Sequence, residues 1–173
     1  MHKNRKVLCR PGAKIKDITK QVQKLRCDKK DLIITQVGTN DLPRTQSEKL
    51  LDDMEQLCEV ARGKTDSHIV IGLLPRLKEG RQHYDDKILY TNRRLRAMSQ
   101  DKGFLFLDLY WEFDGRPHLF ADGQDLNSEG ARVLGACVGI ATRAHFWTKN
   151  VVQRTQPSSS GNAKGNPTPT GPP

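Results

Sequence analysis

Four short, almost uninterrupted apolar runs alternate with longer segments of helical periodicity, and this alternation limits the possible folds more than any other feature of the sequence. The apolar runs cover residues 6–9, 32–37, 69–74 and 104–109. Strands that are apolar on both faces are typical of parallel sheets, because helices cover both sides of such a sheet. The pattern therefore predicts an α/β protein with three α/β/α layers and elements in the order β-α-β-α-β-α-β-α.

Apolar residues recur at helical spacing in the segments between and after these runs. The predicted helices cover residues 14–30, 45–63, 85–102 and 128–146. Thr45 followed by Glu48 is typical of a capping box that opens the second helix. Gly63 and Gly103 are predicted to end the second and third helices, because glycine is favoured just beyond a helix C-terminus.

The composition divides the chain into one domain and a tail. Residues 148–173 are rich in Ser, Gly, Asn, Pro and Thr and contain few apolar residues. Such a segment buries too little surface to offset the entropy lost on ordering, so we predict a disordered tail there. Residues 1–147 are long enough for a single domain with an apolar core.

The positive charge of the chain is concentrated near its start. Residues 1–30 contain eleven Lys and Arg against two Asp, which accounts for the whole net charge of +9. This predicts either a solvated helix face or local contact with nucleic-acid phosphates. The lysines concerned are Lys14, Lys16, Lys20 and Lys24. The first aromatic residue is Tyr84, so the basic segment offers no stacking platform for single strands.

Cysteine spacing and hydropathy argue against a metal site and a membrane span. The four cysteines form no C-x-x-C pair, and no apolar run approaches the about twenty residues that a spanning helix needs. We expect reduced thiols, a cytoplasmic or nuclear location, and no metal or cofactor. The cysteines are Cys9, Cys27, Cys58 and Cys137.

Short polar blocks follow the predicted strands, at the edge where parallel sheets bind their ligands. They are P-G-A at residues 11–13, V-G-T-N-D at 37–41 and D-G-Q-D-L-N-S-E-G at 122–130. In this order the blocks resemble those of the SGNH/GDSL-type esterase and lipase superfamily. The run G-L-L-P-R at 72–76 is similar to one in the esterase-like domains associated with animal retrotransposons.

The resemblance implies a flavodoxin-like parallel sheet and ester or acyl hydrolysis by a Ser-His-Asp triad. Gly12 and Asn40 match two oxyanion-hole donors, and Asp122 matches the aspartate that orients the histidine. Thr39 and Asp41 flank Asn40 and are expected to contribute to binding of a small ester substrate.

The sequence departs from the family pattern in two places. No serine lies in a G-D-S context, and Asp125 occupies the histidine position. A carboxylate with a reference pKa of about 3.9 is a much weaker base than imidazole, at about 6.5. The resemblance therefore implies an incomplete and inactive enzyme that lacks the first strand of its sheet. The alternative is a non-catalytic nucleic-acid-associated module of retrotransposon origin.

Several residues also have an ordinary structural interpretation. Asn40 and Asp41 are common turn formers before a proline, and Asn127 or Ser128 is suited to cap the last helix. His118 is the other possible base near Asp122, or a surface residue. The remaining histidines lie at element edges without evident partners, and two aromatic residues are suited either to line a cleft or to pack. These are His2, His68, His83, His145, Trp111 and Phe113.

Overall fold

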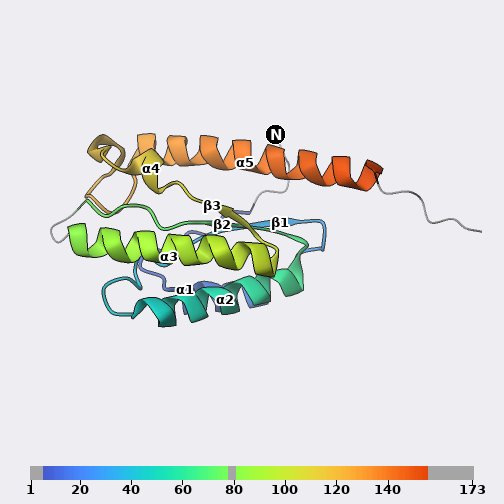
Figure 1. The fold of residues 1–173 in the computed structure, drawn as a ribbon, viewed down its shortest axis with the longest axis horizontal. Helices are drawn as coiled ribbons and strands as arrows, with labels where there is room; N and C mark the ends of the chain where they lie inside the picture. Colours follow the sequence, from blue (N-terminus) through green and yellow to red (C-terminus); the bar gives the residue numbers. More distant parts are fainter. Residues whose placement is uncertain (1–5, 78–80, 156–173) are drawn as a thin grey trace, which may run out of the picture.

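The computed structural model describes residues 6–77 and 81–155, in which a parallel sheet lies between two layers of helices (Figure 1). The sheet order is β1-β2-β3, and its strands are β1 (Leu32–Gln36), β2 (Ser67–Ile71) and β3 (Leu105–Leu107). One layer contains α1 (Ile15–Lys24), α2 (Ser47–Lys64) and α3 (Arg81–Lys102). The other contains α4 (Tyr110–Phe113), the 3₁₀ helix η1 (Pro117–Leu119) and α5 (Ser128–Thr155). The predicted three-layer α/β/α fold is confirmed.

Two apolar clusters hold these layers together, one on each face of the sheet. The first joins the sheet to α1, α2 and α3, and the second joins it to α4, η1 and α5. β2 is buried at every position because it has a strand on both sides and helices on both faces. Full burial is expected for the central strand of a parallel sheet that helices cover on both faces.

β1 is an edge strand with only one covered face. Ile33 and Thr35 are buried beneath α1–α3, whereas Ile34 points to the other face and is 40% exposed. In the parallel register Ile34 lies beside Ile69, which is fully buried. The α5 layer therefore covers the middle of the sheet but leaves the outer part of that face open.

The predicted strand at residues 6–9 does not form, and this prediction was wrong. Residues 6–10 have no regular structure, and Val7 and Leu8 are 67% and 49% exposed. A strand is stabilised by the backbone groups of a neighbour, and among the described residues β1 pairs only with β2. The run therefore has no paired neighbour, and the described order of elements begins with a helix.

Several helix ends differ from the predicted ones. α1 ends at Lys24 because Leu25 adopts an extended backbone. The predicted capping box is wrong: the N-cap of α2 is Gln46, which makes no side-chain capping bond, and Glu48 instead accepts a hydrogen bond from the Tyr90 hydroxyl. α2 also continues through Gly63 to Lys64.

The ends of α3 and α5 bear out two other predictions. Gly103 follows α3 with a φ of +76°, a conformation that strongly favours glycine. Asn127 caps α5, because its Oδ1 accepts the N–H groups of Glu129 and Gly130 at 3.0 Å each. α5 runs past the boundary predicted at residue 147, and residues 156–173 of the predicted tail lie outside the described residues. No described helix combines the length and apolar character that a bilayer crossing requires.

Candidate functional site

The carboxyl ends of the strands meet at one edge of the sheet, at the left of Figure 1. The polar segment 37–41 follows β1 and the segment 72–77 follows β2. The loop 120–126, between η1 and α5, lies against the segment after β2, because the Leu77 N–H donates to the Gly123 carbonyl at 2.7 Å. The predicted site residues come from these segments and from the turn before α1.

Gly12 and Asn40 are brought close together. Gly12 has a φ of +72° in an exposed turn that the Ala13 N–H closes on the Arg10 carbonyl. The Asn40 Nδ2 donates to the Ala13 carbonyl at 3.1 Å. The Asn40 side-chain amide is therefore hydrogen-bonded to the turn that contains Gly12.

Asp41 has a structural role that the sequence did not reveal. It is only 3% exposed, and its Oδ2 accepts the N–H of Ile15 at the start of α1, at 3.1 Å. Burial raises the pKa of the Asp41 carboxyl above its ordinary value. The carboxylate therefore caps α1 from a distant loop and fixes residues 38–41 relative to that helix.

Arg76 joins the segment after β1 to the loop before α5. Its Nη1 donates to the Thr39 carbonyl at 3.3 Å, and its Nη2 donates to the Gln124 Oε1 at 2.5 Å. The guanidinium also lies 4.5 Å from the centre of the Tyr84 ring, a cation–π contact. Arg76 therefore connects the neighbour of Asn40 with the turn that contains Asp122.

Asp122 and Asp125 belong to one tight turn. Asp122 Oδ1 accepts the N–H of Gln124 at 3.0 Å and that of Asp125 at 2.8 Å. The Ala121 N–H donates to the Asp125 carbonyl at 2.8 Å and closes the turn further. Both aspartates are exposed. The carboxylate at the triad position thus holds the backbone of its own loop.

The other predicted residues take varied positions. His118 is exposed on η1, and its carbonyl accepts from Asn127 Nδ2 at 2.6 Å. Phe113 is fully buried in the core, whereas Trp111 is exposed. His2 lies outside the described residues, and the side chain of His83 is not described.

His68 and His145 do have partners, contrary to the prediction. His68 is buried with its Nε2 at 2.9 Å from Thr35 Oγ1, and His145 lies with its Nε2 at 3.4 Å from Ser67 Oγ. Ser67 and His68 are the first two residues of β2, whereas Thr35 is the fourth of the five residues of β1.

Sequence reasoning missed Arg76 and Asn92 as organising residues. Asn92 is buried, accepts from the Leu73 N–H at 2.8 Å and donates to the Leu73 carbonyl at 3.0 Å. The sequence did contain a sign of this role, because Asn92 is a polar residue at an inward position of the helix predicted at residues 85–102. Arg76 follows Pro75 in the segment after a predicted strand. Residues at the carboxyl ends of parallel strands commonly contribute to binding sites.

No protein-family model matches the sequence, and no curated protein matches it. Solved structures do match. A GDSL-like lipase from Bacteroides thetaiotaomicron is 18% identical, with 78% of this chain and 73% of the lipase chain covered and a TM-score of 0.65. A member of the lipolytic G-D-S-L family from Veillonella parvula is 20% identical, with 73% of each chain covered and a TM-score of 0.63.

A third similar structure is the esterase domain of the ORF1 protein from the zebrafish ZfL2-1 retrotransposon. It is 30% identical to this chain, with 83% of this chain and 89% of that domain covered and a TM-score of 0.52. The two bacterial structures have the same fold, whereas the zebrafish domain is similar in sequence as well.

Proposed function

Because this chain belongs to the SGNH/GDSL family of lipolytic hydrolases, we propose that it is an ester (acyl) hydrolase domain by descent that does not turn over esters as it stands. In this proposal the chain retains the edge of the sheet at which the family binds substrate but lacks the family's acid–base chemistry. Gly12 and Asn40 take the place of oxyanion donors, Asp122 takes that of the triad aspartate, and Thr39 and Asp41 shape the loop around Asn40.

The observation that carries the proposal is the aspartate at position 125. Ester hydrolysis by this family needs an imidazole that accepts the nucleophile's proton near neutral pH. Asp125 is exposed, and its backbone N–H donates to Asp122 Oδ1. A carboxylate is by its chemistry a much weaker base than an imidazole. The 173 residues also contain no G-D-S tripeptide to supply the serine.

The remaining donors set an upper limit on activity. An oxyanion hole and substrate binding alone leave roughly 10³–10⁴-fold acceleration over water when triad members are removed. Asn40 Nδ2 already donates to the Ala13 carbonyl, which leaves the second amide hydrogen for an oxyanion. We therefore expect turnover within this range at most.

The test is hydrolysis of nitrophenyl acetate by the purified chain, with Asn40→Ala as the matched control. We expect slow hydrolysis by both proteins, with Asn40→Ala no faster than the unchanged chain, and no labelling by a fluorophosphonate, which reacts with activated serines. Rapid turnover that disappears in the Asn40→Ala variant would show a working active site and refute the proposal.

A second candidate function is a nucleic-acid contact, which the exposed lysines of α1 favour. Lys20 and Lys24 face solvent, and none of the ion pairs of the described residues includes them. The similar zebrafish domain comes from a retrotransposon protein. Lys20 and Lys24, together with Lys14 and Lys16, would contact backbone phosphates and would not recognise a particular base sequence.

This candidate is tested by the salt dependence of binding to a duplex and to a single strand. Counterion release predicts that affinity falls linearly with salt on logarithmic axes, with a smaller slope in the Lys20→Gln/Lys24→Gln variant. Absence of binding to either nucleic acid at low salt removes the candidate.

A further inference from the structure

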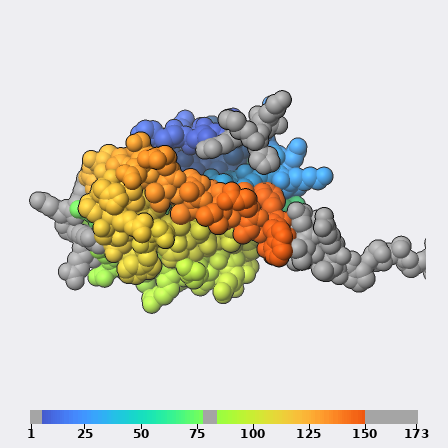
Figure 2. Space-filling model, turned by 90° about the horizontal axis from the view of Figure 1, so that it is seen from above, coloured from blue at the N-terminus to red at the C-terminus, as the bar shows by residue number. Residues whose placement is uncertain are grey.

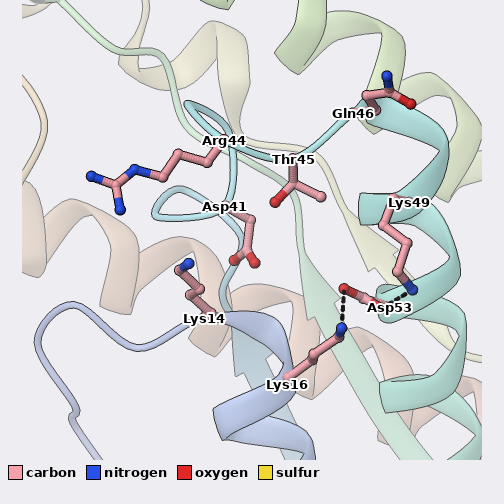
Figure 3. Close-up of a pocket in the computed structure, with 8 residues that line it drawn as sticks. All are labelled: Lys14, Lys16, Asp41, Arg44, Thr45, Gln46, Lys49 and Asp53. Carbon is pink, nitrogen blue, oxygen red and sulfur yellow. Dashed lines mark hydrogen bonds and ion pairs between the residues drawn. The ribbon is translucent and has the colours of Figure 1, made fainter.

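A basic cavity of about 520 Å³ opens between the N-terminal ends of α1 and α2, beside the loop that follows β1 (Figure 3). It lies at the same edge of the sheet as Asn40, since its wall includes Asp41. The lining residues are Lys14, Lys16, Asp41, Arg44, Thr45, Gln46, Lys49 and Asp53. Four cations thus face two carboxylates, which leaves a surplus of two positive charges.

Both carboxylates of the cavity are already engaged. Asp53 is 5% exposed, and its carboxylate pairs with Lys49 Nζ at 2.6 Å and with Lys16 Nζ at 3.9 Å. Asp41 accepts the N–H of Ile15. Neither acid is therefore available to neutralise a further cation, and neither offers an open oxygen cluster for a metal ion.

Lys14 and Arg44 are the two cations of the cavity that lie outside the Lys16–Asp53–Lys49 group. Both are exposed, and neither side chain forms an ion pair with a described residue. Figure 3 shows them projecting along the same side of the cavity, away from the Lys16–Asp53–Lys49 group. Proteins commonly bind phosphate oxygens with an ammonium and a guanidinium group, and Lys14 and Arg44 provide one of each on this side of the cavity.

The start of α2 adds to the positive potential. Its N-cap residue Gln46 lines the cavity and makes no side-chain capping bond. The first N–H groups of the helix then lack an intrahelical acceptor, and the helix dipole is positive at this end. Asp41 supplies this cap for α1, but no described side chain supplies it for α2.

We propose that this cavity binds a phosphomonoester, with its phosphate between Lys14 and Arg44. A dianionic phosphate matches the surplus of two positive charges, whereas a carboxylate matches only half of it. The cavity volume lies within the range of small-molecule sites and exceeds what a lone phosphate fills, so the group attached to the phosphate fits as well. The site goes beyond the proposed function, because it requires no ester hydrolysis.

The experiment is an NMR titration of the full chain that follows backbone amide shifts. The probes are adenosine 5′-monophosphate, adenosine and inorganic phosphate. We expect saturable shifts at residues 14–16 and 41–49 with the monophosphate and with phosphate, and none with adenosine. Equal shifts with adenosine, or no saturable shift with any probe at millimolar concentration, would overturn the proposal.

Two variants with the same change in charge distinguish the cavity from diffuse attraction. Lys14→Gln/Arg44→Gln removes the two cations proposed to contact the phosphate and leaves the Asp53 ion pairs in place, so affinity for the monophosphate should fall about tenfold or more. Lys20→Gln/Lys24→Gln changes α1 outside the cavity and should leave affinity unchanged. An equal loss in both variants would refute a defined site. The amide spectrum of each variant reports whether it is folded.

The source of the phosphate is separated by a further pair of probes. A short oligonucleotide with a 5′-phosphate is compared with the same oligonucleotide without it. Tighter binding of the phosphorylated strand, lost in Lys14→Gln/Arg44→Gln, identifies a nucleic-acid end as a ligand of the cavity. Preference for the free mononucleotide identifies a small metabolite. Equal affinity for both strands, unchanged in that variant, counts against the cavity as a phosphate site.

Discussion

His68 is the buried titratable residue with the clearest consequence for stability. Its Nε2 lies 2.9 Å from Thr35 Oγ1, its Nδ1 has no partner, and burial lowers its pKa to about 4. The unfolded chain, with an imidazole pKa of about 6.5, binds a proton first as the pH falls. Stability is therefore fully present above pH 6.5 and is lost as the pH falls from there towards 4.

We predict that the free energy of unfolding falls by up to about 3 kcal/mol between pH 7 and pH 4 through this residue. Urea unfolding at several pH values measures it. The variant His68→Gln keeps a hydrogen-bonding group near Thr35 but does not titrate, so its pH dependence should be shallower. Identical pH dependence in the two proteins would exclude His68 as the cause.

Arg76 is predicted to hold two distant loops in place. Replacing it with Ala removes the hydrogen bonds to Thr39 and Gln124, and we expect a loss of about 1–3 kcal/mol. Amide hydrogen exchange should become faster in segments 38–41 and 122–126. Arg116→Ala, which removes an exposed ion pair with Glu112, is the control and should change little. Unchanged exchange in both segments would contradict the linking role.

Site residues that belong to local motifs could be predicted from the sequence, and those defined by long-range contacts could not. Gly12, Asn40 and Asp122 were identified because each lies in a short block after a predicted strand or before a helix. The partners of Arg76 lie 37 and 48 residues away along the chain. No periodicity or spacing encodes such a contact.

At the scale of elements, the unpaired edge of β1 is the part of the described sheet most liable to pair with another chain. Its sequence, LIITQ, contains no charge or proline, the usual protection of edge strands against pairing with another chain. Ile34 adds an apolar side chain that is 40% exposed on the uncovered face.

We predict that Ile34→Lys lowers self-association with a small change in stability, because the side chain is already partly in solvent. Light scattering of concentrated protein and sedimentation velocity measure the effect. Gln56→Lys adds the same charge on an exposed position of α2 and serves as the control. If Gln56→Lys reduces self-association equally, net charge is responsible and the edge is not.

Elements were predictable where an apolar pattern coincides with a partner in space. The strands at β1, β2 and β3 and the four long helices were all expected, although α1 ends at residue 24 and not 30, and α5 continues to residue 155 and not 146. The run at residues 6–9 has the composition of a strand but no neighbour to pair with. Strand formation depends on a second segment, so the local pattern alone overestimated it.

At the scale of the whole molecule, a contact near the end of α5 bears on the domain boundary predicted at residue 147. Lys149 Nζ donates to the Asp66 carbonyl at 2.6 Å and to Ser67 Oγ at 2.7 Å, so the last turns of α5 are fastened to the start of β2. The composition-based boundary at residue 147 would remove this contact, whereas a boundary at 155 keeps it.

We predict that the chain shortened to residues 1–155 unfolds at the same temperature as the full chain. The chain shortened to residues 1–147 should unfold about 5 °C lower, because it loses the two hydrogen bonds that the charged Lys149 ammonium donates to Asp66 and Ser67. Thermal unfolding followed by circular dichroism checks both, with Lys149→Met in the full chain as a test of the contact itself. Equal melting temperatures for the two shortened chains would show that residues 148–155 add nothing.

The layered fold was the most predictable level of all, because it depends on a repeated pattern and not on any single residue. Strand-like runs and helical segments alternate along most of the chain, and this alternation has few solutions other than a parallel sheet between helices. The uncovered part of the sheet beside Ile34 could not be predicted, since it depends on how far α5 reaches across the strands.

Under the proposed function, the turn of Asp122 and Asp125 bears on how easily a catalytic imidazole could be regained. Only the backbone of Asp125 takes part in that turn, while its side chain is directed to solvent. Either aspartate codon becomes a histidine codon through one base change. At position 125 such a mutation would place an imidazole on this loop without removing the backbone hydrogen bonds that shape the turn. Under the proposed function, a single base change therefore separates this loop from one that carries the family's histidine.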